Sequence, residues 1–458
     1  MTASLGVFGP TLLPLLPDFA PMSLTRSLLR LRPFLALMLL ALMPLALPGV
    51  SLAEDVILFP YFDANGQNGV YLSWSKDGRN FEQANGGKPI FTPPQWGGGQ
   101  NLTRDPSIVY HDGLFHMVWT SNWSGTIFGH ASSPDLVTWS TPQQVQPFPQ
   151  GGEQPNNVWA PEIFRDHVAE DYKIVWSSTL PSEFNDGDGS QDPHNGDHRM
   201  YYIETTDFQS FSTPELLFQD EGYSVIDAHV VWQSTGSGAS DGRWVMSLKK
   251  EQGTEQGGKN IRLAFSDATI GPSSFGQTTQ PVVGPGTPIR GNEVAEGSST
   301  VFWDNEWLMY WDSYGNGHYS MASSPDLTTW TDETDDLSFP VNHPRHGSVF
   351  IADKDDIGWR LAARADLNDN GMLDTGDWTI FNANHLTSLA PYNELERSLR
   401  GDLDGDGDND FDDFRLFQSD YDKANGQGAF AALRAVPEPG AAALMTLGIA
   451  GGAARQRR

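Results

Sequence analysis

Three acidic residues stand where separate apolar segments of the chain begin, and this placement suggests proton-transfer chemistry. Asp105 lies in Arg-Asp-Pro, Asp227 in Ile-Asp-Ala and Glu296 in Glu-Gly-Ser. Carboxylates that lie close together raise one another's pKa and cost stability, which a purely structural protein would gain nothing from. Acid–base catalysis, in contrast, depends on such perturbed groups. The three acids are therefore candidate catalytic residues, provided that the fold brings them together.

The segments around these acids predict a sheet protein. Alternating apolar runs such as HMVWTS, YKIVWSS and EWLMYWDS are typical of short strands, and residues 55–355 contain no long segment of helical period. Two near-identical turns, ASSPDLVTWS from Ala131 and ASSPDLTTWT from Ala322, each follow such a run. A unit of about four strands that repeats at this spacing predicts a β-propeller.

Five segments are candidates for the innermost strands of the blades, starting at Asp105, Trp159, Asp227, Glu296 and His346. Only one strand follows easily after His346, so the segment from Asp55 through Phe81 is expected to supply the other strands of the fifth blade. This closure leaves only short sheet edges. Because innermost strands run along the central axis, residues at their starts would face the axial mouth, where the three acids would meet.

These motifs resemble glycoside hydrolase family 43, a group of inverting, five-bladed propeller enzymes. The resemblance spans about residues 55–355 and rests on RDPSI, WAPEI, VIDAHVV, EGSSTVFWDNEWLMYWD and RHGSV, in this order. It implies that Asp105 is the general base, that Glu296 is the general acid, and that Asp227 orients the acid and tunes its pKa. Arg104 would help to keep the base ionised, and an ionised Asp227 would raise the pKa of Glu296. Inversion requires about 6.5–9.5 Å between the two catalytic carboxyl groups.

The resemblance also implies substrate-binding roles for four residues: Trp159, Glu162, Arg345 and His346. It allows a cation on the propeller axis at His346. Two of these residues have simpler explanations, since Trp159 could plug the core of the second blade and His346 could only hydrogen-bond inside the channel. Glu293 is a rival for the acid role, disfavoured because it would face a different way from Glu296.

A polar loop, DPHNGDHRMYY, offers further metal-ligand types in Asp192, His194, Asp197 and His198. Histidine and aspartate at such spacing could bind a metal. We favour a polar loop over the rim of the site.

Two acidic twelve-residue loops follow Arg364 and predict a separate calcium-binding domain. Positions 1, 3, 5, 9 and 12 are Asp366, Asn368, Asn370, Asp374 and Asp377 in the first loop, and Asp402, Asp404, Asp406, Asp410 and Asp413 in the second. Gly371 and Gly407 take the sixth position, where such loops turn sharply, and oxygen-only ligands suit Ca²⁺. Each loop leads into a helix-like stretch. The pair resembles a type I dockerin, which implies either docking on a cohesin-like partner or a purely structural calcium module.

Both ends of the chain have the composition of sorting segments. Residues 1–53 contain arginines, an apolar run and a small-residue cleavage site, as in a secretory signal peptide, and Met22 could be the true start. The end, VPEPGAAALMTLGIAGGAARQRR, resembles a PEP-CTERM sorting tail; a disordered end is the alternative. We therefore expect a secreted or cell-surface protein with the domains 1–53 (signal), 54–360 (propeller), 361–430 (small α-helical, EF-hand or dockerin-like) and 431–458 (linker and sorting tail).

Bulk composition narrows the function. The 458 residues include no cysteine, which excludes disulfides, a thiol nucleophile and a thiolate metal site. The net charge of -30 argues against a nucleic-acid partner. The favoured function is a secreted glycoside hydrolase of the arabinofuranosidase or xylosidase class, acting on a polysaccharide or oligosaccharide. A non-catalytic carbohydrate-binding propeller is the alternative. A family 32-type fructosidase lacks support, because its Asn-Asp-Pro-Asn and Glu-Cys motifs are missing.

Overall fold

The structure is a computed structural model that describes residues 55–183 and 198–434, apart from 221–222, 239, 268, 342, 358–363, 369–371 and 393. The predicted signal segment, the sorting tail, Asn370 and most of the polar rim loop (Asp192, His194 and Asp197) lie outside the described residues. The predicted boundary at 360/361 also lies outside them. Among the helices described, none has both the length and the apolar character to cross a membrane.

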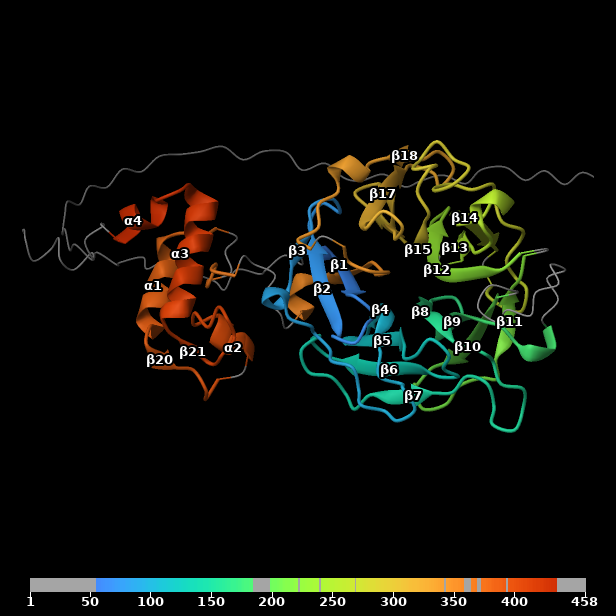
Figure 1. Ribbon diagram of the computed structural model, residues 1–458, viewed down its shortest axis with the longest axis horizontal. Coiled ribbons are helices and arrows are strands. Elements are labelled where there is room, and N and C mark those ends of the chain that lie inside the picture. Colours follow the sequence, from blue (N-terminus) through green and yellow to red (C-terminus); the bar gives the residue numbers. More distant parts are fainter. Residues whose placement is uncertain are drawn as a thin grey trace, which may run out of the picture. The chain divides into compact units, whose positions relative to one another are not determined.

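Five antiparallel sheets surround a common axis and form a five-bladed β-propeller (Figure 1). The first two blades are β4 (Arg104–His111), β5 (Leu114–Thr120), β6 (Phe128–Ser133), β7 (Gln143–Val145), and β8 (Trp159–Asp166), β9 (Asp171–Ser178), β10 (Arg199–Thr205), β11 (Glu215–Phe218). The next two are β12 (Val225–Ser234), β13 (Gly242–Lys250), β14 (Asn260–Ser266), and β15 (Glu296–Trp303), β16 (Glu306–Ser313), β17 (His318–Ser324), β18 (Thr331–Asp332). Short 3-10 helices connect some strands: η1 (Asn85–Gly87), η2 (Pro181–Glu183), η3 (Thr254–Gln256), η4 (Thr334–Asp336) and η5 (Lys354–Asp356).

The fifth blade closes the ring as the sequence predicted. Its strand order is β19-β1-β2-β3, with β19 (Phe350–Asp353) paired antiparallel to β1 (Asp55–Phe62) and followed by β2 (Val70–Ser75) and β3 (Glu82–Gln83). Two expectations need correction. The inner strand of this blade begins at Phe350 instead of His346, because the preceding segment makes only an isolated bridge, Arg345 to Phe62. The third blade has three strands among its described residues; beyond β14, Val283 forms only a bridge to Ile261.

The repeated turns have a shared physical cause. In Ser133–Asp135 and Ser324–Asp326, the serine hydroxyl donates to the carboxylate, which also accepts the N–H groups two and three residues further on. The residue after each aspartate has a left-handed backbone, and its side chain, Leu136 or Leu327, is buried. Ser75–Asp77 and Thr205–Asp207 make the same turn.

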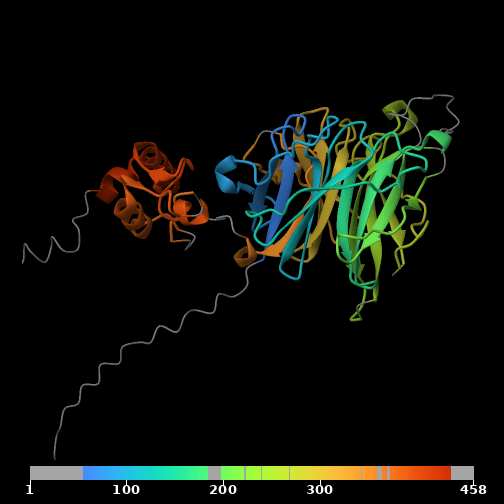
Figure 2. The same cartoon turned by 90° about the horizontal axis from the view of Figure 1, so that it is seen from below.

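The core lies between neighbouring blades. In four blades the second strand contributes a fully buried tryptophan: Trp119, Trp176, Trp244 and Trp311. Viewed from the side, the strands of the blades run alongside one another (Figure 2). The buried apolar residues form separate clusters, and each of the four tryptophans belongs to a different one.

Helices occupy the C-terminal segment: α1 (Thr375–Asn384), α2 (Glu394–Ser398), α3 (Phe411–Asn425) and α4 (Ala429–Arg434), with a small sheet of β20 (Thr387–Ser388) and β21 (Asp408–Asn409). The two longer helices, α1 and α3, begin with the same capping box, built from Asp374 and Asp377 and from Asp410 and Asp413. These helices follow the two acidic loops, where helix-like stretches were expected. The dockerin-like assignment itself stays a prediction.

Candidate active site

A β-bulge at the start of the inner strands sets the geometry of the site. Strand pairing shifts register between Arg104 and Ser107 in the first blade, and at the same place in β8, β12 and β15. The residues in the bulges have left-handed backbones: Asp105 (φ 50°), Ala160 (φ 47°), Asp227 (φ 59°) and Gly297 (φ 55°). Bulges redirect side chains and are common beside active sites. In this propeller the bulge presents Asp105 and Asp227.

Glu296 occupies a different position from the other two acids. It precedes the bulge, at the place taken by Arg104, and Gly297 holds the bulge position. A Cβ at Gly297 would lie 2.5 Å from His346 Cδ2, so only glycine allows His346 this close. The Gly297 N–H donates to Asp227 Oδ2 at 3.1 Å. The structure therefore brings Asp105, Asp227 and Glu296 together, but from two kinds of backbone position.

His346 lies at the centre of the three acids. Its Nδ1 is 3.2 Å from Asp105 Oδ1. Burial would lower the pKa of His346, but Asp227, Asp105 and then Glu296 raise it to about 9. The cation on the axis at His346 stays a prediction. The alternative of a histidine that hydrogen-bonds in the channel matches this geometry.

Asp105 has the protonation state expected of a base. Burial would raise its pKa, but the charge and hydrogen bond of His346, with a smaller effect from Arg104, lower it to about 2. The Arg104 guanidinium lies over the rings of Phe62 and Trp123, at 4.7 and 4.1 Å from their centroids. Asp105 is 9% exposed and stays ionised at neutral pH.

Glu296 and Asp227 have the opposite pKa order from the one expected. Glu296 Oε2 is 3.0 Å from Lys249 Nζ, and its Oε1 is 3.3 Å from Arg345 Nη2. Burial raises the pKa of Glu296, but Lys249, His346 and Arg345 hold it below its usual value. Burial raises the pKa of Asp227 to about 6, and the neighbouring acids contribute to this shift. An ionised Asp227 was expected to raise the pKa of Glu296, but three nearby cations, Lys249, His346 and Arg345, lower it instead.

Sequence reasoning missed Lys249 and Asp312. Asp312 is fully buried; its Oδ2 accepts from Arg345 Nε at 2.7 Å and its Oδ1 lies 2.8 Å from His343 Nε2. Arg345 is therefore aimed at Glu296 by a carboxylate of β16. A signal was present in both cases: a lysine within VMSLKK and an aspartate within LMYWDS stand inside apolar strands. Buried charges need partners, so each predicts an opposite charge nearby.

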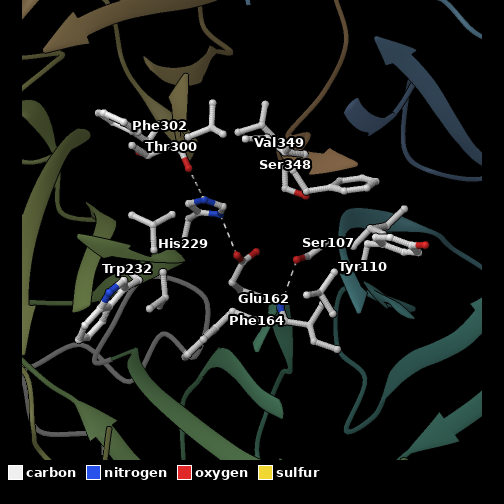
Figure 3. Close-up of a pocket in the computed structure, with 18 of the residues that line it drawn as sticks. Ser107, Tyr110, Glu162, Phe164, His229, Trp232, Thr300, Phe302, Ser348 and Val349 are labelled. Carbon is white, nitrogen blue, oxygen red and sulfur yellow. Dashed lines mark hydrogen bonds and ion pairs between the residues drawn. The ribbon is translucent and has the colours of Figure 1, made fainter. Parts of the chain in front are cut away.

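Glu162 pairs with His229 inside the axial channel (Figure 3). Glu162 Oε1 is 2.7 Å from His229 Nδ1, and His229 Nε2 lies 2.9 Å from the Thr300 carbonyl. Burial would lower the pKa of His229, but Glu162 raises it. The ion pair lines a cavity of about 310 Å³ formed by later residues of the inner strands, and also a small void beside Asp105. The substrate contact predicted for Glu162 stays a prediction.

Trp159 belongs to an aromatic wall at the mouth and is not a core plug. Its Nε1 donates to the Trp123 carbonyl at 2.7 Å, and its ring stacks on His198 with centroids 4.9 Å apart. Trp123 packs edge-on against Trp159 and is 48% exposed. Sequence reasoning missed Trp123, although a tryptophan in a polar loop, SNWSG, was a signal. The rival acid, Glu293, pairs instead with His318 at 3.1 Å.

The second acidic loop of the helical segment gathers carboxylates as a cation site requires. Side-chain oxygens of Asp402, Asp404 and Asp413 lie within 4.8 Å of one another, and so do those of Asp406, Asp408 and Asp413. Asp402 Oδ1 and Asp408 Oδ1 are buried without a hydrogen-bond partner. These orphaned oxygens and the all-oxygen donor set fit Ca²⁺.

The first acidic loop repeats part of this arrangement. Asp377 Oδ1 accepts from the Leu367 N–H at 2.7 Å, as Asp413 Oδ1 accepts from the Leu403 N–H at 2.6 Å. Residues 369–371, with the predicted ligand Asn370, lie outside the described part of this loop.

Comparison with known proteins finds several similar solved structures and one matching family model. A thermostable family-43 glycoside hydrolase is 17% identical, with 56% of this chain and 82% of that chain covered and a TM-score of 0.39. An α-L-arabinofuranosidase from Lactobacillus brevis is 17% identical, with 56% of this chain and 81% of that chain covered and a TM-score of 0.41. An exo-β-1,3-galactanase from Phanerochaete chrysosporium is 11% identical, with 53% of each chain covered and a TM-score of 0.36. No curated protein matches the chain. Residues 55–356 match the family-43-related model described as a probable glycosyl hydrolase domain, and the chain belongs to this family.

Proposed function

We propose that the protein is a glycoside hydrolase that cleaves O-glycosidic bonds with inversion. The supporting observation is the convergence of Asp105, Asp227 and Glu296 around His346. As the base, Asp105 takes a proton from the water that attacks the anomeric carbon. Glu296 gives a proton to the leaving oxygen, and Asp227, bonded to the adjacent Gly297 N–H, orients it.

The wall of Trp123 and Trp159 supports a sugar substrate. Sites for neutral ligands combine apolar and aromatic surfaces with a few polar groups that fix orientation. An exposed tryptophan beside the acids offers a flat surface for the C–H face of a sugar ring. We propose an arabinofuranoside or xyloside, on a polysaccharide or oligosaccharide, and include β-1,3-galactan among the substrates to be tested.

Turnover and stereochemistry test this function. The purified protein is assayed on nitrophenyl glycosides, arabinan, xylan and galactan, with the anomer of the first product followed by NMR. We expect inversion, and a loss of about 10³-fold in kcat for Glu296→Gln with binding retained. Product of retained configuration would contradict the mechanism, and unchanged turnover in Glu296→Gln would contradict the role of Glu296.

A non-catalytic carbohydrate-binding propeller remains the second candidate, because one observation favours it. Lys249 and Arg345 hold Glu296 ionised, whereas an acid must carry a proton. Glycan binding by the wild-type protein, without turnover on any substrate of the panel, would select this function over hydrolysis.

We also propose that the C-terminal segment binds Ca²⁺ through its two loops, as a type I dockerin-like module that serves either as a stalk or as a docking domain for a cohesin-like partner. The proposal is supported by the carboxylate groups of the second loop. In a pull-down with a cohesin domain, calcium-dependent capture would select docking, and no capture would select the structural role.

Export is the last part of the proposed function. We propose secretion and surface sorting on the composition of residues 1–53 and 437–458. N-terminal sequencing of exported protein should find a start close to Glu54. Retention of the full leader in the cell would contradict secretion.

A further inference from the structure

Lys249 is the residue of the site that the proposed mechanism leaves without a role. It lies on β13, its side chain is 2% exposed, and its Nζ lies between two carboxylates: Glu296 Oε2 at 3.0 Å and Glu251 Oε2 at 2.7 Å. The Tyr314 ring covers it, with Nζ 4.9 Å from the centroid. A lysine so enclosed stays charged, and it contacts the two carboxylates at the same time.

Glu251 and Glu296 differ in the second cation that each of them contacts besides Lys249. Glu251 Oε1 has a second cation, Lys259 Nζ, at 2.5 Å. Glu296 has Arg345 Nη2 at 3.3 Å, but Arg345 is shared with the buried Asp312.

The remaining charged and titratable groups around Glu296 come from each neighbouring element: Asp227 from β12, Asp312 from β16, Tyr314 after β16, and His346 from the segment before β19. Among the described groups, Lys249 and Arg345 each touch Glu296 and a second acid outside the catalytic trio. They differ in that the second acid of Lys249, Glu251, has another lysine beside it, whereas Asp312 is fully buried against Arg345 and His343.

We propose that Lys249 is a positioning residue that keeps Glu296 ionised in the free enzyme and moves towards Glu251 when a glycoside binds, so that Glu296 takes up a proton. The inference rests on the proposed function. A glycosidic oxygen has lone pairs and no hydrogen to donate, so it disfavours a facing carboxylate and favours a protonated carboxyl group. The substrate thus binds one protonation state better, which is what a population shift requires.

The proton balance of this cycle is complete. Glu296 takes a proton from solvent as the Lys249 ammonium turns to Glu251, and Lys249 itself stays protonated throughout. Glu296 gives this proton to the leaving oxygen as the C–O bond breaks. Asp105 accepts one proton from the attacking water and returns it to solvent after the product leaves. The net reaction is hydrolysis.

The pH profiles of the intact protein test this role, because kcat/KM reports the acid in the free enzyme and kcat reports it in the complex. In the wild type we expect the alkaline limb of kcat at higher pH than that of kcat/KM. Lys249→Met should raise the kcat/KM limb by about one pH unit or more and close this gap. Lys259→Met, which changes a neighbour of Glu251 but leaves Lys249 beside Glu296, is the matched control and should move the kcat/KM limb by less than Lys249→Met.

A second variant protects the test against misfolding of Lys249→Met. Glu251→Gln removes the alternative partner, so Lys249 stays on Glu296 and the kcat limb should fall towards that of kcat/KM. Limbs that do not move in Lys249→Met or Glu251→Gln, or that move equally in Lys259→Met, would overturn the proposal.

A direct titration separates failure of this inference from failure of the proposed hydrolase function. The carboxyl signal of Glu296 is followed by ¹³C NMR in protein labelled at glutamate, and is assigned by its loss in Glu296→Gln. Lys249→Met should raise its midpoint by about one pH unit or more, with or without turnover. An unchanged midpoint would refute the role of Lys249 even if the enzyme is active.

Discussion

The catalytic mouth of the propeller and the second acidic loop of the helical segment treat clustered carboxylates in opposite ways. At the mouth, Asp105 has His346 at 3.2 Å and Glu296 has Lys249 at 3.0 Å. In the loop, Asp413 accepts from the backbone N–H groups of Leu403, Asp404 and Asp410. The pKa of Asp105 is accordingly lowered to about 2, whereas burial raises that of Asp413 to about 6. The propeller thus pairs its acids with cations of its own, whereas the loop pairs Asp413 with backbone N–H groups, an arrangement that the proposed Ca²⁺ would complete.

Calcium withdrawal should give the largest difference between the two regions. With a dissociation constant of about 1 µM, 1 mM Ca²⁺ stabilises the bound state by about 4 kcal/mol, or about 10³-fold in opening. We therefore expect EGTA to accelerate amide exchange in α3 by up to about this factor, and to leave β4 and β5 within about 2-fold. Hydrogen-exchange mass spectrometry of the full chain measures both regions at once.

Two variants refine the calcium experiment. Asp402→Asn removes a carboxylate of the cluster and should abolish the response of α3. Asp412→Asn is the matched control, since Asp412 is 67% exposed, pairs with Arg415 and is not at a ligand position. If EGTA does not change the rate of amide exchange in α3, or if both variants lose the response equally, the loop does not bind Ca²⁺.

Breaking the internal neutralisation of the propeller should have the next largest effect. Asp312→Asn leaves Arg345 and His343 facing a neutral amide at a fully buried position. Removing one partner of a buried ion pair costs about 3–5 kcal/mol, and we expect the lower end because Glu296 still faces Arg345. Urea unfolding measures the loss, which a Glu296→Gln variant, with its more exposed side chain, should not match. A change below about 1 kcal/mol would show that Asp312 is not needed to hold the arginine.

Local patterns made much of the propeller predictable. The turn of serine or threonine with aspartate forms from neighbouring residues, and the strand after Asp105 ends in a His-Asp-Gly turn as expected, at His111. The start of β8 at Trp159 and the ring closure by β1 also followed from the sequence. These features depend on contacts within a few residues or on the count of strands, and both are visible in a sequence.

The site was less predictable where it depends on contacts between blades. Glu296 precedes the bulge of its strand, whereas Asp105 lies within the bulge of its own strand. This difference depends on how each strand pairs with its neighbour, and the sequence of one strand does not reveal it. Lys249 reaches Glu296 across a blade boundary, and this reversed the expected order of the pKa values of Glu296 and Asp227. The sequence motifs identified the three acids, but the pKa values of Glu296 and Asp227 depend on neighbouring charged groups that the motifs do not contain.

Two buried histidines extend the same comparison. A histidine without a carboxylate partner should have a lowered pKa, whereas the pKa of His346 is raised by its acidic neighbours. His116 Nδ1 lies 3.2 Å from His130 Nε2, and both rings stack on Phe208. Burial lowers the pKa of His116 to about 4 and that of His130 to about 3. The folded state therefore favours the neutral form, and stability present above about pH 6.5 is lost as the pH falls towards 4. At pH 5 the loss is about 2 kcal/mol from His116 alone.

The His116→Leu, His130→Leu double variant isolates this effect. Asp227 and other acids titrate in the same range with the opposite sign, so the wild type alone would mix the contributions. The difference in urea stability between wild type and variant should change by about 2 kcal/mol or more between pH 7.5 and pH 5. A difference independent of pH would mean that the pair is already protonated or solvated in the folded protein.

The smallest effect should come from ion pairs at the surface of each region. Arg79 Nη2 contacts Glu306 at 2.8 Å and Glu333 at 2.5 Å and joins the loop after β2 to the fourth blade, with its side chain 27% exposed. Arg415 pairs only locally, with Asp412, and is 77% exposed. Half-buried networks contribute up to about 1 kcal/mol and fully solvated pairs close to none. Arg79→Met should therefore lower propeller stability by up to about 1 kcal/mol at low salt and by less at 0.5 M NaCl, whereas Arg415→Met should leave α3 unchanged. Equal effects of the two variants, or an Arg79 effect that salt does not weaken, would mean that packing of the aliphatic stem, and not charge, holds the blade closure.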